Sequence, residues 1–115
     1  MTEVVRLTLV SHGMTEAMSA GRFPTDEPLN ALGIRQVENG IDLGTADFAA
    51  CGPEQRTRQT AELLGLQPHT EPDLADLDHG RWRGDYLGRV DPAELALWLT
   101  DAGAAPHGGE SVVDL

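Results

Sequence analysis

The feature that most constrains the fold of this chain is an apolar segment that runs directly into a histidine and a glycine. Residues 4–10 read VVRLTLV, a run rich in β-branched residues and almost continuously apolar. Such a run is typical of a strand covered on both faces within a parallel sheet. The sequence therefore predicts a buried strand whose C-terminal end delivers His12 and Gly13 onto a turn, at the sheet edge where open α/β folds place their sites.

The rest of the chain alternates between helical and strand patterns. Asn30 is a good helix cap, and Ile34, Val37 and Ile41 follow at a spacing of three to four residues. The strand–helix order favours an α/β fold with parallel pairing, and 115 residues suit one domain, 1–115. The further expected elements are a loop over 13–29, a strand over 46–51, a helix over 54–64, a short strand over 67–71, a long functional loop over 72–90, a helix over 91–101 and the opening of another helix at 110–111.

Composition excludes several classes of function. The net charge of −11 argues against nucleic acid, and no apolar run of about 18 residues indicates a membrane span. The N-terminal segment does not resemble a signal peptide, and the single Cys gives no disulfide framework, so we expect a cytoplasmic location. The four histidines lack paired spacing, so we expect neither a metal nor another cofactor. All eight basic residues are Arg, the side chain best suited to forked contacts with phosphate.

Four features carry candidate chemistry. A neutral imidazole at His12 can attack phosphorus and hold it, although a histidine satisfied by hydrogen bonds in a turn is an equally good interpretation. Arg56 falls in the first turn of a predicted helix just after a strand, where free backbone N–H groups also favour anions. Asp76 or Asp78, if buried, suits a general acid, whereas loop acids are more often simply solvated. Residues 108–111, Gly-Gly-Glu-Ser, signal a tight turn.

Taken together and in this order, these segments resemble the histidine phosphatase superfamily, which includes the phosphoglycerate mutases. Members of that family carry Arg-His-Gly-x-Thr after the first strand, then Ser-Pro-x-x-Arg-x-x-x-Thr-Ala, Glu-x-x-x-Gly-x-x-x-Gly and Gly-Gly-Glu-Ser. The resemblance implies a three-layer α/β/α fold with a mainly parallel sheet. The matching segments here are Ser11 to Thr15, Pro53 to Ala61, Asp76 to Gly84, Gly108 to Ser111, and the smaller matches Pro28-Leu29 and Gly33-x-x-Gln36.

The resemblance also implies roles for individual residues. His12 is then the nucleophile that accepts the phosphoryl group, Arg56 the clamp on its oxygens, and Asp76 the acid that protonates the leaving group. The same comparison gives substrate-binding positions to Ser11, Gly13, Thr15 and Arg22.

Three departures from the family pattern stand out. Ser11 replaces the first phosphate-binding Arg, which exchanges a charged fork for one neutral hydrogen bond. Met18 stands where many members have Asn. The family's second histidine, at the end of a later strand, has no counterpart among His69, His79 and His107, and members generally continue past the Gly-Gly-Glu-Ser turn. We therefore expect the 115 residues to be the N-terminal part of a longer catalytic unit, or a homodimer in which a second copy fills the gap.

The sequence leaves three functional hypotheses. The first is a phosphoryl-transfer enzyme, a phosphatase rather than a mutase, that hydrolyses a small phosphate ester through a phosphohistidine on His12. The second is a catalytically decayed pseudophosphatase that binds or regulates, with Ser11 marking the loss. The third is an acidic α/β domain that binds a small ligand, with fortuitous motif matches. The partner expected in the first two is a small phosphorylated substrate or inorganic phosphate.

Overall fold

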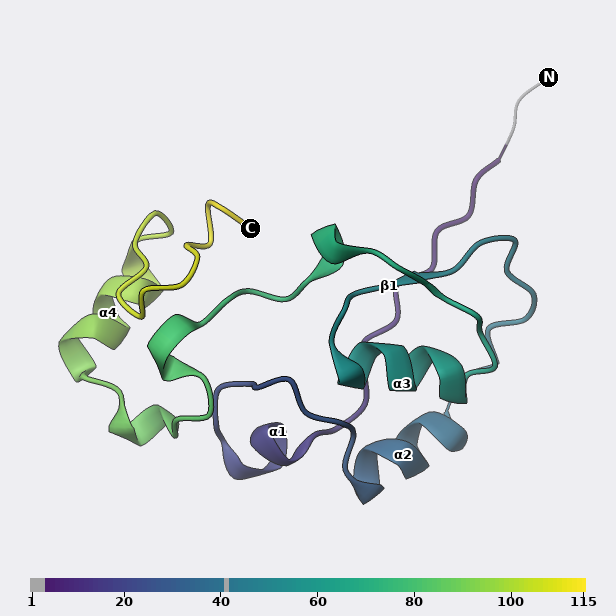
Figure 1. Ribbon diagram of the computed structural model, residues 1–115, viewed down its shortest axis with the longest axis horizontal. Coiled ribbons are helices and arrows are strands. Elements are labelled where there is room, and N and C mark those ends of the chain that lie inside the picture. The colour runs from purple at the N-terminus through teal and green to yellow at the C-terminus, as the bar shows by residue number, and fades with distance from the viewer. Residues whose placement is uncertain (1–3, 41) are drawn as a thin grey trace.

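The computed structural model describes residues 4–40 and 42–115, which form short helices around a small parallel sheet (Figure 1). Strands β1 and β2 pair in parallel, with Ala50 opposite His69 and Cys51 opposite Thr70. The parallel pairing that the sequence predicts is therefore confirmed. In chain order the helices and strands are α1 (Glu16–Ala20), α2 (Ala31–Glu38), β1 (Ala50–Cys51), α3 (Gln55–Leu63), β2 (His69–Thr70) and α4 (Pro92–Thr100).

Side-chain caps present in the sequence start two of the three predicted helices. The Asn30 side chain accepts from Gly33 N at 2.8 Å and starts α2, and Asp91 accepts from Ala93 N at 3.1 Å to start α4. Helix α3 lies within the expected range 54–64. Helix α2 ends at Glu38, and Ile41, expected in its last turn, lies outside the described residues.

The prediction of a buried strand over residues 4–10 is wrong in this structure. The segment carries no assigned strand, and Val4, Val5, Leu7 and Leu9 are 79–89% exposed. A strand exists only through hydrogen bonds to a neighbour. Among residues 4–40 and 42–115, no segment supplies that neighbour to residues 4–10.

Other differences concern short elements. Helix α1, capped by Thr15, lies inside the segment expected to be a loop, because five residues are too few to show a helical period. The predicted strands over 46–51 and 67–71 shrink to two residues each. The expected helix opening at 110–111 is a set of turns in which Ser111 Oγ accepts from Asp114 N at 3.1 Å. The long loop over 72–90 carries three 3₁₀ turns, at Pro72–Leu74, Gly80–Trp82 and Leu87–Arg89.

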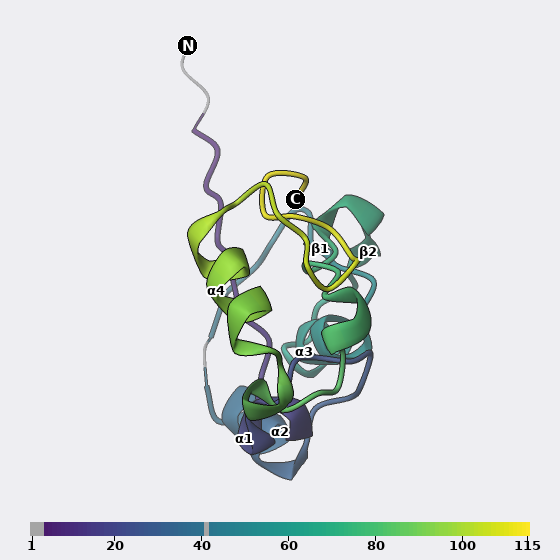
Figure 2. The ribbon, with the colours of Figure 1, turned by 90° about the vertical axis from the view of Figure 1, so that its left-hand side faces the viewer.

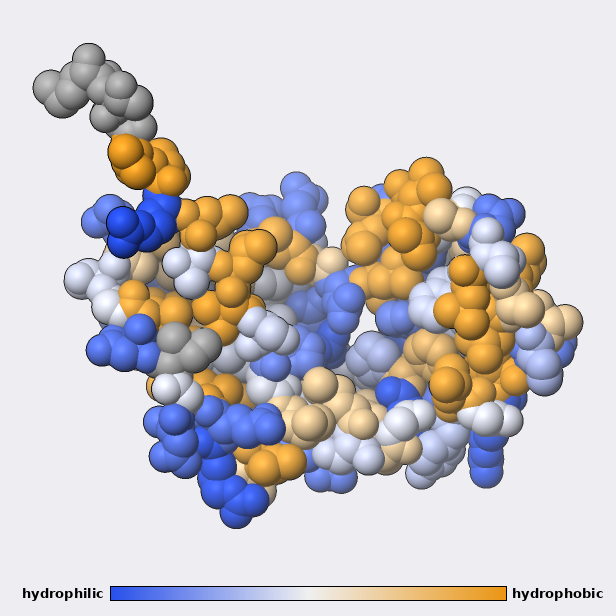
Figure 3. Space-filling model, turned by 180° about the vertical axis from the view of Figure 1, so that it is seen from behind, coloured by the Kyte–Doolittle hydropathy of each residue, from blue (hydrophilic) through white to orange (hydrophobic). Residues whose placement is uncertain are grey.

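Helices α2 and α3 lie side by side, and α3 packs on β1, whereas α4 stands at the other end of the molecule (Figures 1 and 2). The molecule measures 51 × 40 × 19 Å, with a radius of gyration of 16.5 Å. A compact domain of 100 residues has about 13 Å. The structure is correspondingly open, and the space-filling view shows a deep notch between the part that carries the N-terminus and the part around α4 (Figure 3). Within the described ranges no helix exceeds nine residues, so none could cross a bilayer.

The end of the molecule around α4 is organised by packed rings, which we call the aromatic cluster. The ring centroids of neighbouring members lie 4.9–6.4 Å apart. His107 is fully buried and Trp82 is 4% exposed. The members of the aromatic cluster are Phe23, His79, Trp82, Trp98 and His107.

The Gly-Gly turn after His107 docks closely against the segment 78–80. A Cβ on Gly109 would lie 2.1 Å from the carbonyl oxygen of Asp78, so this approach requires glycine. Glu110 N donates to Asp78 O at 2.9 Å, and Asp78 N donates back to the Glu110 carboxylate at 3.1 Å. These reciprocal bonds place the Gly-Gly-Glu-Ser turn beside the loop that carries the candidate acids.

Candidate functional site

The His12–Gly13 turn sets which ring nitrogen of the candidate nucleophile carries the proton. His12 Nδ1 lies 2.8 Å from Gly13 O, an acceptor that can only take a hydrogen bond. The Nδ1 nitrogen therefore carries the proton in the neutral ring, and the lone pair is on Nε2. An imidazole held in this tautomer has one nitrogen available to attack an electrophile.

Two helices hold this turn in place. Gly13 N donates to Thr60 Oγ1 at 3.2 Å, and the same hydroxyl donates to Arg56 O in the preceding turn of α3 at 2.8 Å. On the other side, α2 approaches so closely that a Cβ on Gly33 would lie 2.2 Å from Met14 O. The sequence match at Gly33 thus reflects a close contact between helix and turn.

Arg56 is a buried cation with a donor to spare. The residue is 4% exposed, and its Nη1 donates to Thr25 O at 2.9 Å. Its Nη2 forms an ion pair with Asp76 Oδ2 at 3.1 Å. Its Nε is buried without a hydrogen-bond partner in the described part of the chain. A buried donor left unpaired costs free energy, which an anion reaching this nitrogen would recover.

Asp76 is the loop carboxylate that faces Arg56. Its side chain is 53% exposed, and its Oδ1 accepts from Leu77 N at 2.8 Å. Its backbone N–H donates to the Glu54 carboxylate at 2.6 Å, so Glu54 at the start of α3 fixes the position of Asp76. The Oδ1 of the other candidate, Asp78, accepts a hydrogen bond from Gly80 N at 2.9 Å. The contact with Arg56 places Asp76, rather than Asp78, beside the candidate phosphate clamp.

The remaining residues of the predicted site lie around this pair in different ways. Ser11 is exposed, and within the described residues its side chain makes a single hydrogen bond, to His12 O at 3.4 Å. Thr15 is 1% exposed, and its hydroxyl accepts from Met18 N at 3.3 Å as the cap of α1. Arg22 is half-buried, and its guanidinium lies over the ring of Tyr86. The structure therefore joins Gly13, Arg56 and Asp76 through hydrogen bonds, and leaves Ser11 and Arg22 outside that network within the described residues.

Sequence reasoning missed Glu54, Thr60, and the burial of two histidines. Glu54 had a usable signal, an acid at the start of a helix directly after a Gly-Pro turn. His79 and His107 had none, because a pair of ring centroids 5.9 Å apart comes from residues far apart in sequence. Burial lowers the pKa of His79 from its ordinary 6.5, and the negative charge of Asp76 opposes that shift. Both histidines lie in the aromatic cluster.

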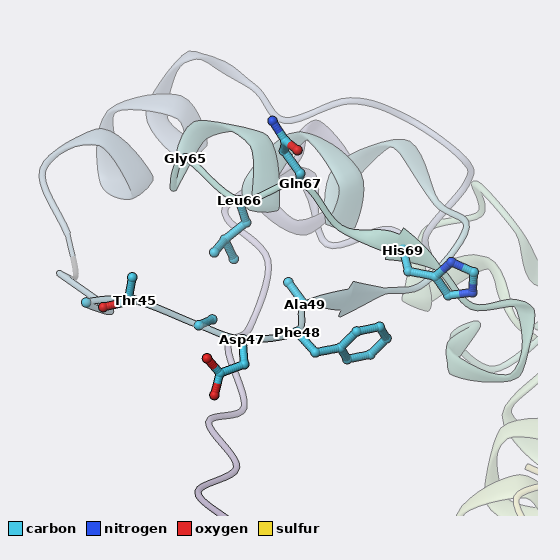
Figure 4. A pocket seen from close by; sticks show the side chains of 10 residues that line it. Thr45, Asp47, Phe48, Ala49, Gly65, Leu66, Gln67 and His69 are labelled. Atoms are coloured by element: carbon cyan, nitrogen blue, oxygen red, sulfur yellow. The ribbon is translucent and has the colours of Figure 1, made fainter.

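A surface hollow of about 350 Å³ lies elsewhere, beside β2 (Figure 4). Its walls come from residues 44–49, residues 65–67 and His69, with Leu66 pointing into it and Asp47 pointing away. None of the candidate catalytic or substrate-binding residues lines this hollow, so we do not assign the functional site to it.

The comparisons with known proteins identify the family of the chain and its fold. The family model of the histidine phosphatase superfamily (branch 1) matches residues 7–115. This chain belongs to that family. Its strands β1 and β2 pair in parallel with α3 packed on β1, and the chain superposes on solved structures of phosphoglycerate mutase-like proteins, so its fold is α/β.

Individual relatives of this chain are phosphatases by name, and one similar solved structure is a phosphoglycerate mutase. The adenosylcobalamin/alpha-ribazole phosphatase of Salmonella typhimurium is 34% identical over 92% of this chain and 59% of its own length. The glucosyl-3-phosphoglycerate phosphatase of Mycobacterium tuberculosis is 30% identical over 96% of this chain and 55% of its own length. The crystal structure of a phosphoglycerate mutase from Thermus thermophilus superposes with a TM-score of 0.75 at 32% identity, over 89% of this chain and 61% of that one. The chain spans between 34% and 59% of the length of the curated relatives that it matches.

Proposed function

We propose that this histidine phosphatase hydrolyses a small phosphate ester through a phosphoryl group carried on His12 Nε2. The observation that carries the proposal is the buried guanidinium of Arg56, which pairs with Asp76 and whose Nε has no partner among the described residues. The helix that carries Arg56 also binds, through the Thr60 hydroxyl, the turn that fixes the His12 tautomer. A cation, an acid and a nucleophile held by one short network are the parts that phosphoryl transfer needs. The names of the two phosphatase relatives support a small phosphorylated substrate.

In the first step His12 Nε2 attacks phosphorus, and a P–N bond forms as the ester P–O bond breaks. Arg56 donates to the equatorial phosphate oxygens, whose charge grows in the transition state. The phosphate competes with the Asp76 carboxylate for Arg56, and Asp76, in its acid form, gives its proton to the leaving oxygen. The products of this step are an alcohol and phosphohistidine.

In the second step water attacks the phosphorus of phosphohistidine. The Asp76 carboxylate takes the proton of the water, the P–N bond breaks, and inorganic phosphate and neutral His12 remain. Gly13 and Thr60 position the turn that carries the imidazole, because Gly13 N donates to the Thr60 hydroxyl of α3, and Thr15 supports the same loop as the cap of α1. Ser11 and Arg22 add polar contacts to the substrate.

The deciding experiment measures hydrolysis of p-nitrophenyl phosphate by the protein and by His12→Ala. We expect the variant to lose turnover by at least about 1,000-fold, because no other group replaces the nucleophile. Phosphohistidine hydrolyses in acid, so the reaction is not quenched with acid, and the labelled phosphohistidine is trapped at alkaline pH. His69→Ala is the matched control, since His69 is exposed and lies on β2. Full activity in His12→Ala would overturn the proposal.

Ser11 favours a second candidate, a phosphate-binding protein with decayed catalysis. A serine offers one neutral hydrogen bond where family members present a guanidinium, and this serine is exposed. In that case phenylphosphonate, a non-hydrolysable analogue, binds to the protein while p-nitrophenyl phosphate is not turned over. Measured turnover that depends on His12 would exclude this candidate.

A further inference from the structure

Glu54 stands at the start of α3, but its carboxylate does not cap that helix. Its backbone has the extended conformation of a cap residue, and its side chain makes no capping hydrogen bond among the described residues. An N–H of the first turn is instead bound from another segment, because Asp26 Oδ1 accepts from Gln55 N at 2.9 Å. The Glu54 carboxylate is therefore free to make a different contact.

That contact is with the segment that carries the candidate acid. Glu54 Oε1 accepts from the backbone N–H of Asp76 at 2.6 Å, and Glu54 Oε2 lies 3.4 Å from Thr57 Oγ1. A Cβ on Gly52 would lie 2.6 Å from Glu54 Oε2 and 2.8 Å from Leu74 O. Glycine at residue 52 thus leaves room for the carboxylate between the start of α3 and the segment that leads to Asp76.

Asp76 is tied to the start of α3 at two points within the described residues. Glu54 binds its backbone N–H, and Arg56, two positions further along, binds its carboxylate at 3.1 Å. In the proposed first step the phosphate competes for Arg56, so the second tie weakens at the moment when Asp76 has to face the leaving oxygen. The bond from Leu77 N to Asp76 Oδ1 lies within the same loop and does not connect it to α3. The contact with Glu54 does not involve Arg56 and persists.

We propose, resting on the function proposed above, that Glu54 is a positioning residue for the acid. It keeps Asp76 beside the leaving oxygen after the phosphate has displaced the Asp76 carboxylate from Arg56. Glu54 acts through the reach of its oxygen to the Asp76 N–H, and its negative charge is not the cause. Displacing a reacting group by about 1 Å can cost about 100-fold in rate, so such a tie affects turnover. Asp76 remains the group that gives the proton.

Two substitutions at residue 54 separate reach from charge. Glu54→Gln keeps the length of the side chain and an acceptor oxygen but removes the charge. Glu54→Asp keeps the charge and introduces a favoured cap residue, but its carboxylate is one methylene shorter and does not reach the Asp76 N–H. A role in capping or in the helix dipole would survive in Glu54→Asp and be lost in Glu54→Gln. The control is Glu62→Ala, because Glu62 is an exposed acid on the same helix.

Hydrolysis of phenyl phosphate and of p-nitrophenyl phosphate measures the effect. We expect Glu54→Asp to lower kcat about tenfold with phenyl phosphate and less than about twofold with p-nitrophenyl phosphate, whose leaving group needs little protonation. KM should stay nearly unchanged. Glu54→Gln and Glu62→Ala should keep kcat within about threefold, since a neutral acceptor retains part of a charge-assisted bond. Glu54→Asp should cause no further loss in the Asp76→Asn background, because the group that it positions is already absent.

Hydrogen exchange of the Asp76 amide, with phenylphosphonate bound, reads the same contact without turnover. We expect the amide to be protected in the unsubstituted protein and in Glu54→Gln. In Glu54→Asp it should exchange about tenfold faster, because the N–H loses its acceptor. An unprotected amide in the unsubstituted protein would overturn this inference.

The outcomes distinguish this inference from the proposed function. Equal losses with both esters in Glu54→Asp, or a further loss in the Asp76→Asn background, would overturn the inference and leave the proposed function standing. Full activity in Glu54→Asp with a loss in Glu54→Gln would assign the effect to charge and overturn it as well. Absence of turnover that depends on His12 would overturn the proposed function and, with it, a catalytic role of Glu54.

Discussion

The region around His12, Arg56 and Asp76 and the aromatic cluster are built from opposite chemistry, although the segment 76–82 belongs to both. The first is a network of charged and polar groups in which Arg56 Nε has no partner among residues 4–40 and 42–115 and Asp76 is half exposed. The second is a set of closely packed rings, most of them buried. The comparison shows that the segment 76–82 contributes a candidate catalytic group at its first residue and a tightly packed ring at its last.

The two regions also differ in how their unpaired polar atoms are used. In the first region the free Nε of Arg56 is a donor that an anion can satisfy. In the second, His79 Nδ1, Trp98 Nε1 and His107 Nε2 are buried among rings without a partner in the described part of the protein. Burying these nitrogens without a partner lowers the free energy of unfolding, and the packing of the rings offsets that loss. Substitutions in the two regions should therefore separate activity from stability.

The largest expected effect is on the aromatic cluster. Trp82→Ala should lower the free energy of unfolding by about 3–5 kcal/mol, because it leaves a cavity where four rings meet. Urea unfolding followed by circular dichroism measures the change. The control is Leu99→Ala in α4, whose side chain is 70% exposed and whose loss should change stability by less than about 0.5 kcal/mol. Equal losses in both variants would mean that the rings do not form the stable part of the fold.

The next effect is on Asp76. Asp76→Asn should lower hydrolysis of phenyl phosphate by about 100-fold, because a general acid contributes at least that much. The loss should be smaller with p-nitrophenyl phosphate, whose leaving group needs less protonation. Phenylphosphonate should bind more tightly, since Arg56 no longer pairs with a carboxylate. Asp73→Asn, an exposed acid in the same segment, is the control; a uniform loss with both esters would contradict the assigned role.

A smaller effect is expected at Ser11. Ser11→Arg should raise hydrolysis of p-nitrophenyl phosphate by about tenfold, since a guanidinium offers charge-assisted hydrogen bonds to the phosphate. Stability should hardly change, because Ser11 is exposed and its side chain makes one long hydrogen bond in the part of the chain that the structure describes. Unchanged turnover together with unchanged phosphonate affinity would show that residue 11 does not face the phosphate.

The smallest effect concerns pH and returns to the aromatic cluster. Burial lowers the pKa of His79 in the folded state below its ordinary 6.5, so the unfolded chain binds more protons in the interval between these two values. Stability contributed by neutral His79 is therefore full above pH 6.5 and is lost as the pH falls through the folded pKa. Urea unfolding at several pH values checks this; His79→Phe should show a flatter dependence between pH 6.5 and 5. An equally steep dependence in that variant would assign the loss to other groups.

Much of the helical structure and part of the site followed from local signals. Asn30 and Asp91 are caps whose side chains act on their own helices, so the starts of α2 and α4 were predicted correctly. The His-Gly turn and the position of Arg56 early in α3 also follow from neighbouring residues. The strand predicted over residues 4–10 is absent because a strand needs a hydrogen-bonded partner. Apolar, β-branched composition indicates only that a segment can form a strand when such a partner is present. The contact between Arg56 and Asp76 could not be predicted from the sequence, because it depends on how the loop after β2 returns to α3.

The sequence alone determined the family, the nucleophile candidate and the helix starts, since motifs and caps act over a few residues. Only the tertiary structure decided that Asp76 rather than Asp78 faces Arg56, that two histidines are buried among tryptophans, and that Glu54 binds the backbone of Asp76. Those arrangements join residues far apart along the chain, and the free energy of such contacts depends on close packing that no local pattern encodes.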